Sequence, residues 1–235
     1  MVLVSHPHRF IFLKTSKTAG TSVEMALEHA CAPDGHVAVE KTPTRMSKYG
    51  IIGSRIWPHE MPPEPAAEPG MWVNHKTAKD IKTDLGAERF DRYIKITTVR
   101  NPFDRCVSAF HWLYPQQAHE NNSFAQIRQS FQEFILAQKW KTDRNTVFID
   151  DEFIIDRAVR FEHLRSDLSS LAKDLRVAVY INALPHTKST HLSRKDYAVA
   201  DYYDEKTIKV VRNRSRWMID HFNYPDHPNS NEVPQ

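Results

Sequence analysis

The sequence predicts an α/β fold in which helices flank a central, mostly parallel sheet. Two segments carry this prediction, residues 10–30 and 94–110. Each passes from a short apolar run through a polar turn into an apolar pattern of helical spacing. Alternation of strands and helices is typical of a parallel sheet covered on both faces. A chain of 235 residues is long enough to bury one large core, so we expect a single domain over residues 1–235.

Composition agrees with a globular protein, since 40% of the residues are hydrophobic and 26% are charged. The net charge of +3 is too small to indicate a nucleic-acid partner. Two cysteines, Cys31 and Cys106, are too few for a disulfide framework and are expected to be reduced thiols. The first 13 residues lack the apolar stretch of a signal peptide, and no apolar run is long enough to span a membrane. We therefore expect a cytoplasmic location.

The first element is a strand over residues 10–13, followed by a helix with apolar residues at 23, 26, 27 and 30. The turn between them contains Lys17 and Gly20. A turn from a strand into a helix start presents free backbone N–H groups and the positive end of the helix dipole to an anion. Gly20 lets the backbone approach a ligand without a Cβ in the way. The turn is therefore predicted to bind phosphate, and the alternative is an ordinary strand–helix connection.

The turn is not a Walker A loop, because Lys17 precedes Gly20 instead of following the last glycine. Its order, Lys-Thr-Ala-Gly-Thr-Ser, resembles the 5′-phosphosulfate loop of sulfotransferases that use 3′-phosphoadenosine-5′-phosphosulfate (PAPS). The resemblance implies a three-layer, P-loop-like fold and a donor site in this loop. The implied donor-binding residues are Lys17, Thr18, Ala19, Gly20, Thr21 and Ser22. Lys17 is also assigned a catalytic role, because its charge suits the leaving oxygen.

A second motif follows the strand predicted at residues 94–99. Asn101 is a good helix N-cap and Pro102 suits the first helical position. Arg100 then lies at the carboxyl end of the strand, where open α/β sheets bind ligands, and Ser108 lies two turns into the helix. A guanidinium and a hydroxyl at such an edge suit a phosphate.

Residues 99–108 resemble the sulfotransferase 3′-phosphate motif, Val-Arg-Asn-Pro-x-x-Arg-x-x-Ser, in its carbohydrate-type form. The resemblance implies that Arg100 and Ser108 hold the 3′-phosphate of PAPS and that 3′,5′-ADP is the product. It also implies a glycan or glycolipid acceptor. Asp104 and Arg105 match the motif too, and either ligand contact or structural pairing is open for them. The resemblance covers about residues 9–224, although residues 33–70 match nothing.

His75 lies between the two motifs, in a segment that resembles the family's source of the catalytic base. Imidazole accepts a proton near neutral pH, so His75 is the predicted general base. Lys76, Glu24 and His111 remain alternatives for this role. No metal is predicted, because the sequence contains no metal-ligand spacing of histidines and cysteines.

Amphipathic helices are predicted at residues 78–85, 124–137, 163–175 and about 204–221. Thr77 followed by Asp80 resembles a capping box for the first of these. Residues 33–70, with five prolines between 57 and 70, are interpreted as a long surface excursion. It is either a lid over the acceptor site or a solvent-covering loop. Residues 225–235 are expected to form a flexible tail.

Two other functional classes stay open. In a P-loop kinase or NTPase, residues 146–151 would form a Walker B strand with Asp150 on magnesium. A glycan-binding protein of the same fold without turnover is the other alternative. The intact Lys17, Arg100 and Ser108 favour an enzyme.

Overall fold

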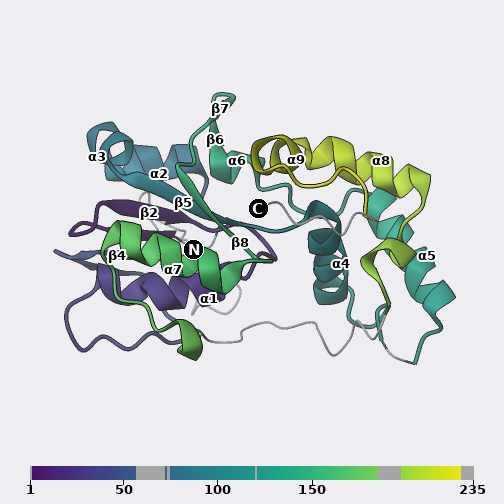
Figure 1. Ribbon diagram of the computed structural model, residues 1–235, viewed down its shortest axis with the longest axis horizontal. Coiled ribbons are helices and arrows are strands. Elements are labelled where there is room, and N and C mark those ends of the chain that lie inside the picture. Colours follow the sequence, from purple (N-terminus) through teal and green to yellow (C-terminus); the bar gives the residue numbers. More distant parts are fainter. Residues whose placement is uncertain (1, 57–71, 73–74, 120, 185–196, 229–235) are drawn as a thin grey trace, which may run out of the picture. The chain divides into compact units, whose positions relative to one another are not determined.

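Figure 1 shows the computed structural model of the chain, which describes residues 2–56, 72, 75–119, 121–184 and 197–228. Contacts within the chain divide it into two units. The first comprises residues 1–98 and 143–187, and the second comprises residues 99–142 and 188–235. Each unit is described by itself below.

The first unit is built on a six-stranded mixed sheet with the strand order β3-β4-β1-β2-β5-β8. Its strands are β1 (Val2–Ser5), β2 (Phe10–Leu13), β3 (Arg45–Ser47), β4 (Gly50–Ile52), β5 (Ile94–Val99) and β8 (Arg157–Arg160). β1 and β2 form an antiparallel hairpin, with Leu3 opposite Phe12. β2 and β5 are parallel, with Phe12 opposite Ile96. The carboxyl ends of β2 and β5, which precede the two predicted phosphate motifs, therefore lie at the same edge of the sheet.

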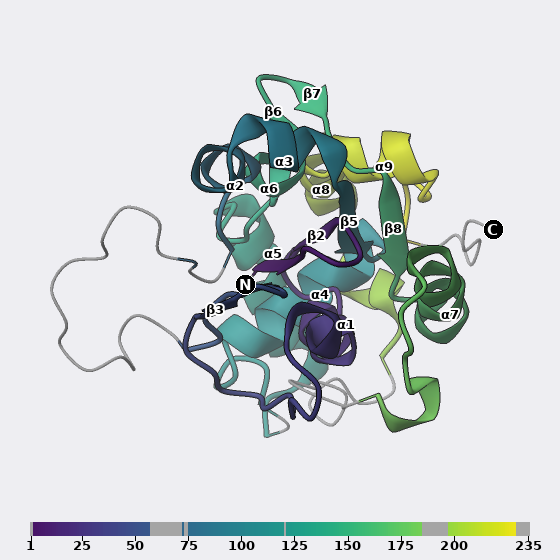
Figure 2. The same cartoon turned by 90° about the vertical axis from the view of Figure 1, so that its left-hand side faces the viewer.

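Side chains alternate between the two faces of β1 and β2, and each face has its own core. Leu3, Phe10 and Phe12 pack with α1 (Gly20–Leu27), η1 (Glu28–Cys31) and α7 (Leu164–Leu175). Val2, Val4, Ile11 and Leu13 pack with α2 (Ala78–Leu85) and α3 (Ala87–Arg92). Figure 2 shows these helix groups on opposite faces of the sheet. The predicted α/β fold with a central sheet between helices is confirmed.

The segment over residues 33–70 differs from its prediction as a surface excursion. β3 and β4 lie within it and extend the sheet, with β4 paired antiparallel to β1. Gly50 makes this pairing close, because a Cβ there would lie 1.9 Å from the carbonyl oxygen of Val4. All three residues of β4 are buried. Residues 57–70, on which the proposed lid depends, lie outside the described residues.

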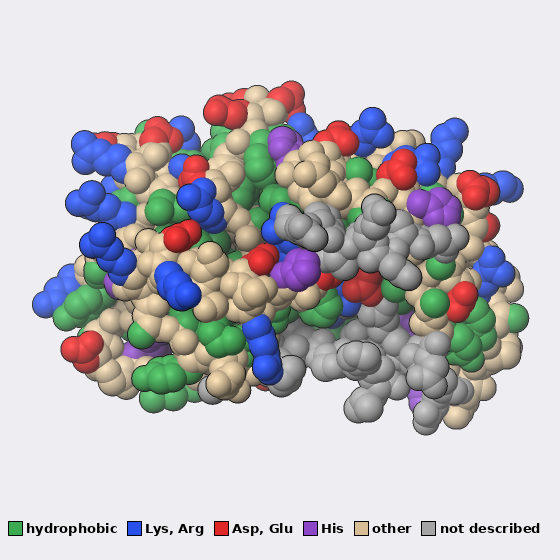
Figure 3. All heavy atoms as spheres, in the orientation of Figure 1, with side chains coloured by type: hydrophobic (Ala, Val, Ile, Leu, Met, Phe, Trp, Pro, Cys, Tyr) green, Lys and Arg blue, Asp and Glu red, His purple; other side chains and the backbone are tan. Residues whose placement is uncertain are grey.

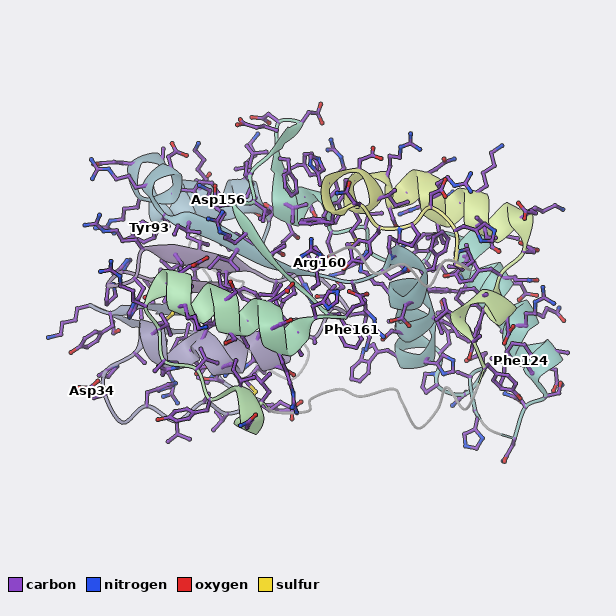
Figure 4. The ribbon with its side chains drawn as sticks, in the orientation of Figure 1. Asp34, Tyr93, Phe124, Asp156, Arg160 and Phe161 are labelled. Atoms are coloured by element: carbon purple, nitrogen blue, oxygen red, sulfur yellow. The ribbon has the colours of Figure 1, made fainter. Side chains whose placement is uncertain are left out.

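β8 is anchored beside the start of β5 by Asp156, which is labelled in Figure 4. Its backbone N–H donates to the carbonyl of Lys95 at 2.9 Å, and its carboxylate accepts from the backbone N–H of Lys95 at 2.7 Å. The first unit also contains α6 (Arg144–Val147), the two-stranded sheet of β6 (Phe148–Ile149) and β7 (Glu152–Phe153), and η3 (Ile181–Ala183).

The second unit is helical. It contains α4 (Pro102–Leu113), α5 (Phe124–Leu136), η5 (Val199–Tyr202), α8 (Glu205–Arg214) and α9 (Arg216–Phe222). Its core is rich in aromatic side chains, and Tyr203 donates its hydroxyl to the carbonyl of Phe103 at 2.8 Å. The helix predicted over 204–221 is divided at Ser215, where φ is −104° and ψ is 16°. The other three predicted helices are present as α2, α5 and α7, and the side chain of Thr77 caps α2 as predicted.

Cys31 and Cys106 are both free and buried, in agreement with their prediction as thiols. Burial raises the pKa of Cys106 to about 12. Burial also raises the pKa of Cys31 well above its usual value, and the negative charges of Glu28 and Glu24 add to the effect.

On the face of the first unit seen in Figure 3, lysine and arginine are interspersed with aspartate and glutamate, so the surface charge there is of both signs. Within the part of the chain that the structure describes, no helix is long and apolar enough to cross a membrane.

Candidate active site

The predicted phosphate loop covers residues 14–22; its residues 14–19 connect β2 to α1 in the middle of the first unit's sheet, and residues 20–22 form the first turn of α1. Two of its residues, Lys17 and Ala19, have left-handed backbone conformations with φ of 60°. Ala19 is the N-cap of α1 and provides no side-chain cap. The N-cap side chain therefore accepts no hydrogen bond from the backbone N–H groups of the first turn of α1. An anion binds favourably at such a helix start.

Gly20 is the first residue of α1, and there is little space for a side chain at this position. A Cβ at this position would lie 2.8 Å from Cγ of Lys14 and 3.2 Å from Oγ1 of Thr98. Its φ is not in the left-handed region, so conformational freedom is not the reason. Close approach of a ligand to Gly20 stays a prediction, and tight packing of the helix start over Lys14 and β5 is a second reason for a glycine here.

Three buried threonines hold the loop against β5. Oγ1 of Thr18 lies 2.7 Å from Oγ1 of Thr98 and 2.9 Å from Oγ1 of Thr15. Thr18 is fully buried. Its hydroxyl is thus engaged by the other two threonines, so Thr18 would contact a bound phosphate through its backbone N–H. Thr21 and Ser22, in the first turn of α1, are also largely buried.

Asp143 anchors the loop from a distant part of the chain. Its carboxylate accepts from the backbone N–H of Ser16 at 2.8 Å and from the Ser16 hydroxyl at 2.9 Å. Asp143 is only 4% exposed and has a φ of 54°. The sequence carries no signal for this residue, because 127 positions separate it from Ser16. The contact fixes the loop immediately before Lys17.

Asp143→Ala is expected to weaken binding of 3′,5′-ADP about tenfold and to lower the melting temperature. The two donors of Ser16 would lose a charged acceptor in a partly buried place, which costs about 1.5–3 kcal/mol per bond. Isothermal titration and thermal melting measure the two effects. Asp151→Ala is the matched control, since Asp151 pairs with Arg144 at the surface and its side chain is 88% exposed. Equal affinities and melting temperatures for Asp143→Ala and the wild type would contradict this anchoring role.

His75 lies beside the phosphate loop within the first unit. Its Nδ1 is 3.3 Å from the carbonyl oxygen of Lys14, and its backbone φ is 58°. A carbonyl oxygen can only accept, so Nδ1 carries the proton in this contact. In the neutral ring, Nε2 is then the nitrogen that accepts a proton. The structure thus places His75 beside the loop with Nδ1 toward a backbone carbonyl oxygen, and its role as general base stays a prediction.

The three alternative bases have structural partners. Glu24 is fully buried, and its carboxylate lies 3.2 Å from Nζ of Lys14. Lys76 forms an ion pair with Asp84. His111 belongs to the second unit, where it is buried with its Nε2 at 3.0 Å from a tyrosine hydroxyl. His75 is half-buried beside the loop, and its role as the base stays a prediction.

The second predicted motif lies in the second unit, which begins at Val99, the last residue of β5. Asn101 caps α4 as predicted, accepting from the backbone N–H of Phe103 at 2.9 Å and of Asp104 at 3.3 Å. Arg100 is 7% exposed, and its Nε donates to the carboxylate of Asp104. The pair fixes the guanidinium at the start of α4.

The remaining motif residues follow on α4. Ser108 is 2% exposed. Arg105 is equally buried, and its Nη2 donates to the carbonyl of Lys141 at 2.8 Å. Asp104 and Arg105, for which ligand contact or structural pairing was open, therefore both have structural partners.

The segment that the kinase alternative requires as a Walker B strand is not part of the central sheet. Asp150 lies in the turn between β6 and β7, which form a separate two-stranded sheet. Its side chain is 79% exposed and pairs with Lys79 at 3.4 Å. A Walker B aspartate would end a buried strand of the central sheet. Among the described residues, no group of three or more histidines, cysteines, aspartates and glutamates is placed to hold a metal ion.

Comparison with known proteins agrees with this geometry. The sequence model of the sulfotransferase family matches residues 1–225, which is nearly the whole chain. A search of the curated proteins found no match, and neither did a search of the solved structures. The matched range contains residues 14–22, residues 99–108 and His75. The chain therefore belongs to the sulfotransferase family, and its chemistry is sulfuryl transfer.

Proposed function

We propose that this sulfotransferase takes the sulfuryl group from PAPS and transfers it to a hydroxyl group of a carbohydrate. The observation that carries the proposal is the contact between His75 and the loop that holds Lys17. A base and a cation for the leaving group are the two groups that sulfuryl transfer to a hydroxyl requires. The loop's resemblance to the PAPS-binding sequence of carbohydrate-type sulfotransferases supports the donor and the acceptor class.

The residues present fit the two phosphates of PAPS. The loop amides and the hydroxyls of Thr21 and Ser22 suit the 5′-phosphate, because α1 begins there without a side-chain cap. Arg100 and Ser108 suit the 3′-phosphate, since a guanidinium held at Nε by Asp104 has a fixed direction for binding an oxyanion. These roles follow the sulfotransferase motif residue by residue.

PAPS, when bound, supplies an activated sulfuryl group and 3′,5′-ADP as the leaving group. His75 accepts the proton of the acceptor hydroxyl at Nε2, which the contact of Nδ1 with Lys14 leaves as the basic nitrogen. Lys17 neutralises the negative charge that builds up on the departing oxygen. The loop, fixed by Asp143 and the threonine contacts, orients the donor, so most of the catalysis is positioning and charge stabilisation.

The donor assignment predicts that 3′,5′-ADP binds about 10- to 100-fold more tightly than 5′-AMP, without a metal ion. Charged hydrogen bonds to the extra phosphate contribute about 1.5–3 kcal/mol each, and about 1.4 kcal/mol is a tenfold change in affinity. Arg100→Ala should remove most of the difference. Isothermal titration measures it directly, with ATP and Mg²⁺ as the test of the kinase alternative.

Arg216→Ala is the matched control for Arg100→Ala, because Arg216 forms the same i,i+4 pair with an aspartate at the surface of the second unit. Equal affinities for 3′,5′-ADP and 5′-AMP would refute the 3′-phosphate role. Transfer of label from PAPS to a panel of glycans and glycolipids tests the whole function. Tight 3′,5′-ADP binding with no transfer to any acceptor would favour the glycan-binding alternative.

A further inference from the structure

Lys14 is the residue at which three parts of the candidate site meet. Its carbonyl oxygen accepts from His75, and its Cγ lies directly under Gly20 at the start of α1. Its ammonium pairs with Glu24, one turn further along α1, at an Nζ to Oε2 distance of 3.2 Å. The backbone and side chain of this residue therefore connect the predicted base to the helix that begins the phosphate site.

The ion pair beneath the loop is fully enclosed. Glu24 is 0% exposed and Lys14 is 5% exposed. Arg55 approaches the same carboxylate oxygen at 3.8 Å and also pairs with Glu28, which is buried as well. Two cations thus balance two carboxylates in one network, and His36 adds a contact to Glu28 at 2.7 Å. A buried charge that loses its partner is strongly unfavourable, so each member is held in place by the others.

We propose that Lys14 is a positioning residue for His75. The helix start at Gly20 fixes the side chain of Lys14 at its stem and the pair with Glu24 fixes it at its end, so its carbonyl remains available to Nδ1 of His75. That contact keeps the proton on Nδ1 and leaves Nε2 to act as base. Without it, the proton can occupy Nε2, and a protonated Nε2 in the neutral ring cannot accept another. This inference rests on the proposed function, in which His75 is the base.

The burial of Lys14 separates its role from that of Lys17. Its ammonium is paired inside the protein, whereas Lys17 is only partly buried. Lys14 therefore acts through His75 and the loop and not by contact with substrate. A purely structural role would affect stability alone, so the test must compare stability with the state of His75.

The decisive variant is the double substitution Lys14→Met with Glu24→Gln. Both changes keep the side-chain volume, and together they remove one positive and one negative charge while Arg55 and Glu28 stay paired. The double variant should therefore fold even where Lys14→Met alone does not. The matched control is Lys79→Met with Asp150→Asn, which removes an exposed ion pair from the same unit.

Four measurements are made on each variant and on the wild type: melting temperature, 3′,5′-ADP affinity, kcat with PAPS, and the imidazole ¹⁵N signals of His75. The His75 signals are identified by their loss in His75→Gln. We expect the double variant to melt near the wild type and to bind 3′,5′-ADP within about twofold. Its kcat should fall about 10- to 100-fold, the effect of a displaced catalytic group. Its ¹⁵N signals should move from the Nδ1–H to the Nε2–H tautomer.

A double variant with wild-type kcat and an unchanged Nδ1–H signature would overturn the inference. Loss of kcat in proportion to loss of 3′,5′-ADP affinity would overturn it too, because Lys14 would then support only the phosphate loop. The ¹⁵N comparison does not depend on turnover. If the wild type transferred nothing from PAPS, the proposed function would fail, while the tautomer of His75 would still decide whether Lys14 positions it.

Discussion

His75→Ala is expected to lower kcat by about 10²- to 10⁴-fold, the usual contribution of a positioned general base. The affinity for 3′,5′-ADP should stay unchanged, because the role proposed for His75 is toward the acceptor hydroxyl and not the nucleotide. The contact of Nδ1 with the carbonyl of Lys14 leaves Nε2 as the nitrogen that would accept the proton in the proposed role. Steady-state kinetics with PAPS and titration with 3′,5′-ADP measure the two quantities separately.

The pH profile adds a second readout for His75. An imidazole base works only when it is unprotonated, so kcat/KM of the wild type should decline on the acidic side. This acidic limb should disappear in His75→Ala. His8→Ala is the matched control, because His8 is also half-buried and its Nδ1 also contacts a backbone carbonyl, that of Leu175 at 3.0 Å. A His75 variant with normal activity and the same profile would transfer the role to Lys76, Glu24 or His111.

The parts of the site that were predictable from sequence are those encoded within a few residues. β2 with α1 and β5 with α4 follow from an apolar run, a turn and a helical pattern, and Asn101 caps α4 as its residue type indicates. Thr77 caps α2 for the same local reason. Such signals are readable without the rest of the chain, because caps and apolar periodicity are carried by residues close in sequence.

The contacts that fix the site could not be predicted, because they join distant positions. Ser16 binds Asp143 across 127 residues, and His75 reaches the carbonyl of Lys14 across 61. Neither contact leaves a periodic pattern or a motif. Glu24 illustrates the same limit: it was a candidate base in the sequence, and only the structure shows that it is buried and paired with Lys14.

The hairpin of β3 and β4 was missed for a different physical reason. Each strand has only three residues, and all three residues of β3 are exposed. Period-two alternation needs a longer run to be recognised. The glycine at position 50 was interpreted as part of an excursion, yet it allows β4 to lie against Val4 of β1. A short strand is thus defined by its partner and not by its own sequence.

Lys17→Ala is expected to lower kcat by about 10²- to 10³-fold, the range for removal of one group that stabilises developing charge. The affinity for PAPS should fall less, because the charge on the leaving oxygen develops only as the S–O bond breaks. Comparison of kcat with the dissociation constant of PAPS under single-turnover conditions separates the two. Lys17→Arg should retain more activity than Lys17→Ala, since it keeps the positive charge.

The backbone of Lys17 must be separated from its charge in this test. Its φ of 60° is unfavourable for any residue with a Cβ, and the strain is of order 1 kcal/mol. Lys17→Gly removes the charge and the strain together, whereas Lys17→Ala removes only the charge. If the charge is what matters, both variants lose kcat equally, although Lys17→Gly relaxes the loop.

Arg9 provides the matched control for Lys17. It is a cation with a φ of 50° in the turn between β1 and β2, at the opposite end of β2 from the phosphate loop. Arg9→Ala should therefore leave both kcat and PAPS affinity unchanged. If Lys17→Ala weakened PAPS binding and left kcat unchanged, Lys17 would bind phosphate in the ground state only. The charge on the leaving oxygen would then have to be stabilised by the amides of the loop and α1.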